Sequence, residues 1–448
     1  MRKYITIICS ILCVSFTFAQ RPWSFRDCVD FALQNNIEIK QQDLQVKNAE
    51  VNLSTSKNSR LPDLSGSIGQ NFNFGRSPSM ETGIYEENKA SNTSFYLSSG
   101  IPIFTGFSIP NQIKANEMSL KSATEGLLRA REDLQVQIAS YFLDILFKKE
   151  ILKVYEEQLN LTQTQVERTQ ILVENGKVAL SQLYDIKAQE ANAELNVTTA
   201  YNNLQTSLLN LAQLLNLRSA DNFDIQVPDI DAMSMTETIR TTDIPEQVYQ
   251  TAIGIKPHVK EAEYRVGNSK YNLKVAQAGY WPTLSLGLSY NNGFNHVYGL
   301  SETETNKPIG DQLRDNYRAV IGFSLNIPIF NRFETRNKVR QARLEIQNQE
   351  LNLANVKLNL YKEIQQAYQN AIASRAKFTS TEKAYEAAAE SFKYAEERYQ
   401  IGKSTVFEYN EAQTKLISSR SEQIQAKYEL VFNSKILDFY KGMQIDIY

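Results

Sequence analysis

The tetrapeptide Ile-Pro-Ile-Phe occurs twice in this chain, at residues 101–104 and 327–330, and it constrains the fold more than any other feature. The shift in numbering that takes residue 101 to residue 327 also places Gly176 over Gly402, at a second pair of matching segments. Matches that recur in the same order at one shift indicate an internal duplication. The chain is therefore expected to fold as two copies of one structural unit.

The limits of the two copies follow from the segments around these matches. We expect repeat 1 over residues 20–217, a connector over residues 218–245, and repeat 2 over residues 246–448. Upstream, Pro62 matches Pro282 at a shift that is smaller by six, so one loop is expected to be longer by six in the second copy. Each copy shows strand-type periodicity first and helix-type periodicity afterwards.

Alternation of apolar and small polar residues predicts two β-strands in each copy. The alternation covers about residues 63–75 and 92–104 in the first copy, and about 283–293 and 316–330 in the second. A period of two over roughly ten residues indicates a strand with one apolar and one polar face. The polar faces consist mainly of Gly, Ser and Asn, which are too small to fill a protein core, so an apolar face against lipid is favoured.

Apolar residues at every seventh position follow the second strand of each copy. They predict a coiled-coil-like helix from about Ser108 to Glu174, roughly 100 Å long at 1.5 Å per residue, and a second such helix at the matching positions of the second copy. Gly176 and Gly402 end these runs, as a left-handed helix cap would, and helical sequence resumes beyond them. Each copy is thus expected to contain one long helical hairpin.

Residues 1–19 have the pattern of a secretory signal peptide. Arg2 and Lys3 precede an apolar run, and Ala19 ends a small-residue cleavage context. Only Cys28 would remain in the mature chain, so no intrachain disulfide is expected. Past residue 19 there is no run of 18 apolar residues, so no transmembrane helix is expected either.

Composition argues against several classes of protein. Removal of Arg2 and Lys3 reduces the 48 basic side chains to 46 against 50 acidic ones, a net charge of −4 that gives no nucleic-acid footprint. With only two histidines, the chain has no cluster with metal-ligand spacing and no credible Ser/His/acid set. We therefore expect neither an enzyme nor a bound metal or cofactor.

Four strands cannot form a closed barrel alone. Lipid tolerates no open sheet edge, and single-chain barrels begin at about eight strands. Two alternatives follow. The sheet either belongs to a non-channel periplasmic coiled-coil scaffold, or the protein oligomerises to complete a barrel in a membrane.

Taken together, the features resemble the TolC family of outer-membrane efflux and secretion channel proteins. The resemblance rests on the signal peptide, the duplicated strands and hairpins, the proline before the first strand of each copy, the two Ile-Pro-Ile-Phe stretches, and Tyr399-Gln-Ile-Gly402 at a hairpin tip. It covers nearly the whole mature chain. It implies an α+β membrane protein, a homotrimer in which four strands per protomer form a 12-stranded β-barrel that is continued by a periplasmic α-helical barrel.

The resemblance also implies partners and sites at the hairpin tips. A periplasmic adaptor (membrane fusion) protein and an inner-membrane pump are the implied partners, with outer-membrane lipid around the barrel. The adaptor-docking tips, at about 175–180 and 401–406, would be Asn175, Gly176, Lys177 and Val178, and Ile401, Gly402, Lys403 and Ser404. A periplasmic gate would be formed by Tyr399, Glu408, Glu411, Gln182 and Asp185.

The gate departs from the family's pattern at one position. Where that pattern has an arginine two residues after the second tip glycine, this chain has Ser404, so the family's arginine–carboxylate latch lacks its arginine there. Glu408 and Glu411 lie three residues apart on one helical face, and our hypothesis is that they form rings of like charge that favour cations. The alternatives are that they are surface acids on the adaptor side and that Tyr399, a heptad position, is a packing residue.

The two Ile-Pro-Ile-Phe stretches are predicted to be joints between a strand and a helix. Pro102 and Pro328 cannot donate a ladder hydrogen bond, so strand pairing is expected to stop there. Phe104 and Phe330 would lie at the periplasmic boundary of the membrane, where aromatic girdles occur.

The resulting prediction is a passive exit duct in the outer membrane of a Gram-negative bacterium, with a long periplasmic extension. It would be the channel of a tripartite efflux pump and would conduct small molecules such as drugs. The outer-membrane component of a type I protein secretion system has the same architecture and is the alternative, because the sequence of a duct does not identify its cargo or its pump.

Overall fold

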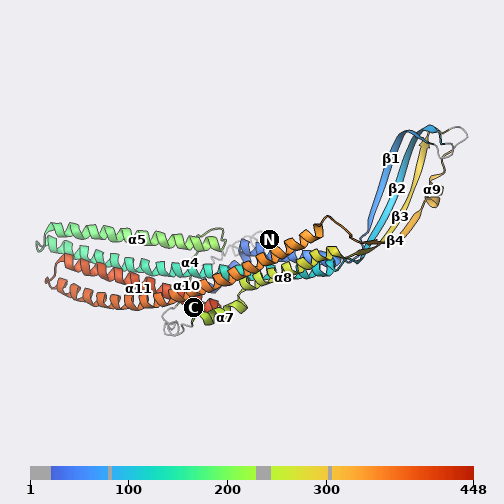
Figure 1. Ribbon diagram of the computed structural model, residues 1–448. Coiled ribbons are helices and arrows are strands. Elements are labelled where there is room, and N and C mark those ends of the chain that lie inside the picture. Colours follow the sequence, from blue (N-terminus) through green and yellow to red (C-terminus); the bar gives the residue numbers. More distant parts are fainter. Residues whose placement is uncertain (1–21, 79–82, 229–243, 301–304, 448) are drawn as a thin grey trace, which may run out of the picture. The chain divides into compact units, whose positions relative to one another are not determined.

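The computed structural model describes residues 22–78, 83–228, 244–300 and 305–447, which belong to two compact units (Figure 1). We call them the hairpin unit, which comprises Met1–Leu44, Glu125–Lys260 and Asn355–Tyr448, and the sheet unit, which comprises Gln45–Thr124 and Glu261–Ala354. Each unit receives segments from both halves of the chain. The expected signal peptide and part of the expected connector lie outside the described residues.

The sheet unit contains one antiparallel sheet whose strands follow the chain order β1-β2-β3-β4. The strands are β1 Ser65–Pro78, β2 Tyr85–Phe104, β3 Thr283–Tyr298 and β4 Arg318–Asn326. The register places Ile68 opposite Phe95, and Leu286 opposite both Ile101 and Phe323, so the predicted apolar series of all four strands share one face.

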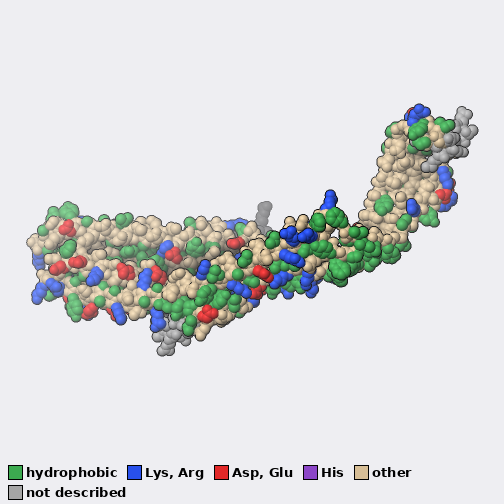
Figure 2. Space-filling view, viewed as in Figure 1, with side chains coloured by type: hydrophobic (Ala, Val, Ile, Leu, Met, Phe, Trp, Pro, Cys, Tyr) green, Lys and Arg blue, Asp and Glu red, His purple; other side chains and the backbone are tan. Residues whose placement is uncertain are grey.

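The two faces of the sheet differ sharply in their side chains. On the apolar face, Ile68, Phe74, Ile321 and Phe323 are 71–75% exposed. The face visible in Figure 2 carries mainly small or uncharged polar side chains. Burying this apolar surface would contribute about 25 cal/mol per Å², so exposure of this face to water is unfavourable.

The strands differ from the sequence prediction at their ends, and one helix was not expected. Strands β1 and β3 extend to Pro78 and Tyr298 rather than to about residues 75 and 293. Strand β2 begins at Tyr85 rather than near residue 92, because its polar first part lacks apolar alternation but still pairs with β1 through backbone hydrogen bonds. Strand β4 ends at Asn326 rather than near residue 330, and a short helix, α9 Ile309–Asp315, lies between β3 and β4.

The helices come in pairs, one from each copy of the duplication. They are α2 Phe25–Asn35 with α7 Pro245–Ile255, α3 Ile37–Asn58 with α8 Pro257–Gln277, α4 Ser108–Glu174 with α10 Glu334–Gln400, and α5 Leu180–Leu214 with α11 Val406–Tyr440. The shift that relates the two Ile-Pro-Ile-Phe stretches also takes the bounds of α4 and α5 to those of α10 and α11, and α4 has the extent that the heptads predict. In the described part of the chain, no helix is both long enough and apolar enough to cross a membrane.

Heptad packing holds the two long hairpins together internally. The predicted positions on α4 and α10 are all buried or half-buried, among them Ile138, Ile145 and Ile364, which are fully buried. Val166 of α4 packs with Leu183 and Ile186 of α5. In the second copy, Phe378 of α10 packs with Ala426 and Leu430 of α11. Figure 1 shows α5 running antiparallel beside part of α4, and α11 running antiparallel beside part of α10.

The joints between strand and helix have the same backbone geometry in both copies. Two successive residues adopt positive φ, Gly106 and Phe107 in the first copy (62° and 67°) and Arg332 and Phe333 in the second (53° and 62°). In each joint the phenylalanine of Ile-Pro-Ile-Phe packs edge-to-face on the phenylalanine three residues later, with ring centroids 5.3 and 5.5 Å apart. The geometry turns a strand end directly into the first turn of α4 or α10.

The expected role of the prolines is wrong in detail. Pairing does not stop at Pro102, which lies opposite Ser285; the register shifts there and pairing continues to Phe104. In the second copy pairing ends at Asn326, two residues before Pro328. A missing donor is tolerated at Pro102 because the local irregularity accommodates it, as at a β-bulge.

The matched positions Gly106 and Arg332 give a test of the joint geometry. A Cβ added to Gly106 would lie 2.7 Å from the carbonyl oxygen of Ala278 and 2.7 Å from Cβ of Trp281. We expect Gly106→Ala to destabilise the protein by at least about 2 kcal/mol, from left-handed strain plus the clash. Arg332→Gly should change stability by less than about 1 kcal/mol, because relief of strain offsets the entropy cost of glycine. Thermal unfolding in detergent, followed by helical circular dichroism, measures both; equal effects would contradict the assignment.

Candidate functional site

The tips of the two hairpins are built by the same cap. At the first tip the amides of Gly176 and Lys177 donate to the carbonyls of Val173 and Leu172 (2.9 Å each). At the second tip Gly402 and Lys403 donate in the same pattern to Tyr399 and Arg398, at 3.1 and 2.8 Å. Both glycines have positive φ, 68° and 73°, which is the left-handed C-cap that glycine adopts at low cost.

The predicted docking residues lie on these two turns, and most of them are exposed. Asn175, Lys177, Ile401 and Lys403 are exposed along with the two glycines, whereas Val178 and Ser404 are half-buried. Beneath the first turn, Val173 of α4 and Val406 of α11 pack against the same apolar cluster, so the two tips share a core. The tips thus present two lysines together with exposed apolar side chains, among them Leu180, Ile401 and Phe407.

Glu408 has a structural role at the start of α11. Its carboxylate accepts hydrogen bonds from the hydroxyl of Ser404 (2.6 Å) and the amide of Thr405 (3.1 Å), while the Thr405 hydroxyl accepts from the Glu408 amide (3.2 Å). This reciprocal pair is a capping box. The hydrogen bond from Ser404 lowers the pKa of Glu408 below its usual value, and the hydrogen bond from the Thr405 backbone lowers it further by a smaller amount. Ser404, where the family's pattern has arginine, therefore contacts Glu408 through a hydroxyl.

Tyr399 lies at the contact between the two hairpins. Its ring packs on that of Tyr409 with centroids 4.9 Å apart, and the guanidinium of Arg168 lies 5.9 Å from its centroid. Arg168 also donates a hydrogen bond to the carbonyl of Gln400 (3.2 Å). An arginine of α4 thus ties the end of α10 to the first hairpin.

Sequence reasoning missed Arg168 because it looked for the arginine at a fixed distance from the tip glycine. No spacing signal points to Arg168, since it lies on the first hairpin and is remote from Tyr399 along the chain. Both readings of Tyr399 are compatible with its position, since it is half-buried as a packing residue and also contacts a charged group.

The predicted gate residues of the first hairpin are not brought to those of the second within one protomer. Gln182 is half-buried in the first turn of α5, and Asp185 is exposed one turn later. In the parts of the chain that the structure describes, no hydrogen bond or ion pair joins either residue to Tyr399, Glu408 or Glu411.

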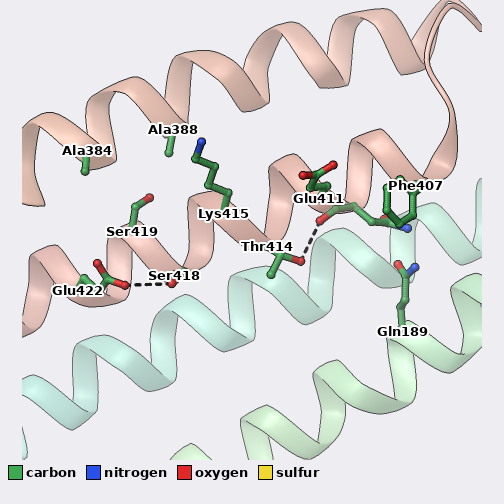
Figure 3. Close-up of a pocket in the computed structure, with 11 residues that line it drawn as sticks. Gln189, Ala384, Ala388, Phe407, Glu411, Thr414, Lys415, Ser418, Ser419 and Glu422 are labelled. Carbon is green, nitrogen blue, oxygen red and sulfur yellow. Dashed lines mark hydrogen bonds between the residues drawn. The ribbon is translucent and has the colours of Figure 1, made fainter.

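Glu411, unlike Glu408, lines a groove on the hairpin unit. The groove has a volume of about 760 Å³ and is lined by side chains from α5, α10 and α11, including Gln189, Ala384, Ala388, Phe407, Lys415 and Glu422 (Figure 3). Ala384 and Ala388 offer little side-chain bulk, and Phe407 is 74% exposed. The two acids of the proposed ring thus lie in different surroundings, one in a helix cap and one beside an open groove.

The fold of the chain is that of solved outer-membrane channels. The outer membrane channel CmeC of Campylobacter jejuni superposes with a TM-score of 0.77 at 18% identity, covering 94% of this chain and 87% of CmeC. The chain belongs to the outer membrane efflux protein family, whose model matches residues 29–217 and 248–442. The resemblance to the TolC family is thereby confirmed, as is the expected location in the outer membrane.

Relatives with curated names agree with this assignment. The outer membrane efflux protein BepC of Brucella suis is 20% identical over 406 residues, which cover 91% of this chain and 82% of BepC. The outer membrane protein TolC of Escherichia coli is 21% identical, over 97% of this chain and 85% of TolC. Both relatives are thus outer membrane proteins, in agreement with the matched family of outer membrane efflux proteins.

The capping box predicts how the second tip responds to acid. Because the pKa of Glu408 is lowered in the folded protein, its contribution to stability is present above the unfolded value of 4.5 and is lost as the pH falls through the folded value. Hydrogen exchange of the first turn of α11, corrected for intrinsic rates, should therefore accelerate on acidification in the wild type. Glu408→Gln should show a faster exchange with little dependence on pH, and Glu411→Gln should behave as the wild type. A wild-type response retained in Glu408→Gln would contradict the cap.

Proposed function

We propose that the protein is the exit duct of a tripartite efflux pump and passively conducts small molecules such as drugs across the outer membrane. The observation that carries the proposal is the sheet, which exposes one continuous apolar face and continues at both strand-to-helix joints into hairpins whose helices have 67 and 35 residues. A face of this kind is stable against lipid, and the longer helix of each hairpin is roughly 100 Å long.

The sheet requires further copies of the chain. Strands β1 and β4 each have one edge without a strand partner in the described residues, and backbone groups left unpaired in hydrocarbon cost several kcal/mol each. A homotrimer that joins β4 of one protomer to β1 of the next gives a 12-stranded barrel with no open edge. The hairpins of three protomers would continue it as a periplasmic α-helical barrel.

The hairpin tips are the proposed docking site for a periplasmic adaptor protein that links the duct to an inner-membrane pump. Their exposed backbone turns and the lysines Lys177 and Lys403 are available in the protomer, and lysines on a rim guide the approach of acidic partners. Export of small molecules is favoured by membership of an efflux family. Type I protein secretion stays the alternative, and an adaptor and pump gene next to the gene for this chain would distinguish the two.

The contacts of Arg168 with Tyr399 and Gln400, which we call the tie, are proposed to hold the tunnel in a constricted resting state. Arg168 contributes a hydrogen bond and a cation–π contact to the end of α10, together worth about 1 kcal/mol at an exposed site. Loss of the tie would let the second hairpin move away from the first at the tip.

Planar-bilayer recording tests both the duct and its tie. The wild-type protein should be extracted by detergent from outer-membrane fractions as a trimer and should give discrete conductance steps. Arg168→Gln should raise the single-channel conductance severalfold. Arg398→Gln is the matched control, because it removes the same charge near the tip without touching the first hairpin in the described residues: Arg398 donates to the carbonyl of Lys403 (3.4 Å) and its charge acts on Glu408, both of its own hairpin. It should conduct as the wild type. Release of the protein by osmotic shock, or trimers without conductance, would favour the scaffold instead.

Ion selectivity tests the proposed ring of acids. Since the Glu408 carboxylate is engaged in the cap, we expect Glu411 to contribute more of the cation selectivity, and Glu411→Gln to shift the reversal potential in a salt gradient towards zero. Glu408→Gln/Glu411→Gln should shift it further. Glu390→Gln, an exposed acid of α10 away from the groove, should leave it unchanged. Unaltered selectivity in the double variant would show that neither acid faces the lumen.

A further inference from the structure

The edge strand β4 is shorter than its neighbour β3. β3 has 16 residues and β4 has nine, and the two pair only between residues 283 and 291 of β3. The outer part of β3, residues 292–298, pairs with β2 on one side and has no strand partner on the other side among the described residues. Its backbone groups would be an open edge.

Three side-chain amides occupy this edge. Oε1 of Gln312 accepts from the amide of Asn295 and its Nε2 donates to the carbonyl of the same residue, both at 2.9 Å. The side chain of Asn306 makes the same pair of bonds with Val297, both at 2.8 Å. Nδ2 of Asn316 donates to the carbonyl of Gly293 (2.8 Å). We call Asn306, Gln312 and Asn316 the amide ladder.

The amide ladder reproduces the hydrogen bonds of a β-strand. In an antiparallel pair, every second residue exchanges both its N–H and its C=O with the residue opposite. A carboxamide carries one acceptor and one donor group with similar spacing. Residues 293, 295 and 297 are the alternate positions whose backbone N–H and C=O groups point away from β2. Each of them is hydrogen-bonded by one side-chain amide of the ladder.

Helix α9 holds the amide ladder in place. Gln312 lies on this helix, is only 5% exposed, and also donates to the carbonyl of Lys307 (2.7 Å). Nδ2 of Asn292 donates to the carbonyl of Leu313 (2.9 Å), which fastens the helix to β3. Lys307 forms an ion pair with Asp315 at the end of the helix. The segment is therefore a fixed part of the sheet unit.

The opposite edge of the sheet has a different length. β1 has 14 residues and pairs with β2 along its whole extent, from Ser65 opposite Ser98 to Pro78 opposite Tyr85. In a closed oligomer β1 of one copy faces β4 of the next, and β4 offers nine residues. The outermost residues of β1 therefore have no strand to pair with in the neighbouring copy.

We infer that the amide ladder ends the strand pairing between protomers, and that α9 takes the place of a strand against the outer part of the neighbouring β1. The inference rests on the proposed oligomeric duct and adds the surface through which the copies meet. Two exposed apolar side chains flank α9: Ile309 (54% exposed) at its first residue and Tyr317 (62%) just before β4. The outer half of β1 carries exposed Phe72 and Phe74. The partner that fits this surface is a second copy of the chain.

Disulfide trapping in outer membranes tests the inference on the full chain, in which Cys28 is buried and unpaired. Cysteines are placed pairwise, one in a scan of β1 from residue 66 to residue 76, and the other at one of three places. Ile321→Cys reports pairing with β4, Ile309→Cys or Tyr317→Cys reports contact with α9, and Asn295→Cys reports whether the ladder-covered edge is open. Non-reducing electrophoresis detects covalent dimers.

The three placements separate failure of the inference from failure of the proposed duct. We expect dimers from Ile321→Cys with inner positions of β1, dimers from the α9 cysteines with outer positions, and none from Asn295→Cys. If Ile321→Cys gives no dimer with any position, the oligomeric duct itself is wrong. If Ile321→Cys gives dimers while the α9 cysteines give none, or while Asn295→Cys gives them, the inference is overturned.

A second measurement examines the amide ladder directly. In Asn306→Ala/Gln312→Ala, backbone exchange at residues 295 and 297 should accelerate by about tenfold or more, because each side-chain amide lost removes two hydrogen bonds to the backbone of β3. Asp311→Ala/Arg314→Ala breaks an ion pair on the exposed side of the same helix and should leave that exchange unchanged. Equal exchange in the two double variants would show that the ladder does not protect the edge.

Discussion

The unpaired backbone of an edge strand is the constraint on which the rest of this structure depends. A sheet of four strands exposes one row of N–H and C=O groups along β1 and another along β4, and a lipid environment has no water to satisfy them. In the proposed trimer, closure by identical copies would remove both rows at once. The chain treats the outer part of β3 differently, by satisfying it with its own side-chain amides. One problem therefore has two solutions within a single sheet.

The duplication shows which parts of the fold keep the same backbone geometry in both copies although their residues differ. Helices α10 and α11 repeat the bounds of α4 and α5 at the shift that relates the two Ile-Pro-Ile-Phe stretches, and both joints use two successive left-handed residues although one has Gly106 where the other has Arg332. At the first joint a side chain is excluded, because a Cβ at Gly106 would meet Ala278 and Trp281. The copies diverge most at the outer end of the sheet, where a strand hairpin in the first copy corresponds to β3, α9 and β4 in the second.

Periodicity predicted what depends on periodic contacts. The long helices follow from heptads such as Ile138 and Ile145, which are fully buried, and the apolar sheet face follows from a period of two. The outer part of β2, helix α9 and the amide ladder could not be predicted, since they rest on backbone pairing and on amides whose partners are separated in sequence without a repeating pattern. At the tips, the caps follow from two glycines, whereas the contact of Arg168 with Tyr399 depends on the packing of one hairpin against the other.

The bends between the short and the long helices show that the duplication preserves a position while its chemistry changes. Asn36, between α2 and α3, donates from Nδ2 to the carbonyl of Leu214 at the end of α5 (3.2 Å). Its counterpart between α7 and α8 is Lys256, whose ammonium lies 3.1 Å from Glu132 and over the ring of Phe439 at the end of α11. Burial lowers the pKa of Lys256, and the charge of Glu132 opposes that shift. Loss of the Asn36 side chain would remove three hydrogen bonds of a neutral group, one to Leu214 and two from the amides of Glu38 and Ile39. Loss of Glu132 would instead leave a buried charge without its carboxylate partner. The end of α11 thus packs against a buried ion pair, Lys256–Glu132, whereas the matching end of α5 accepts a neutral hydrogen bond. The tip of the same second hairpin is the end that Arg168 contacts.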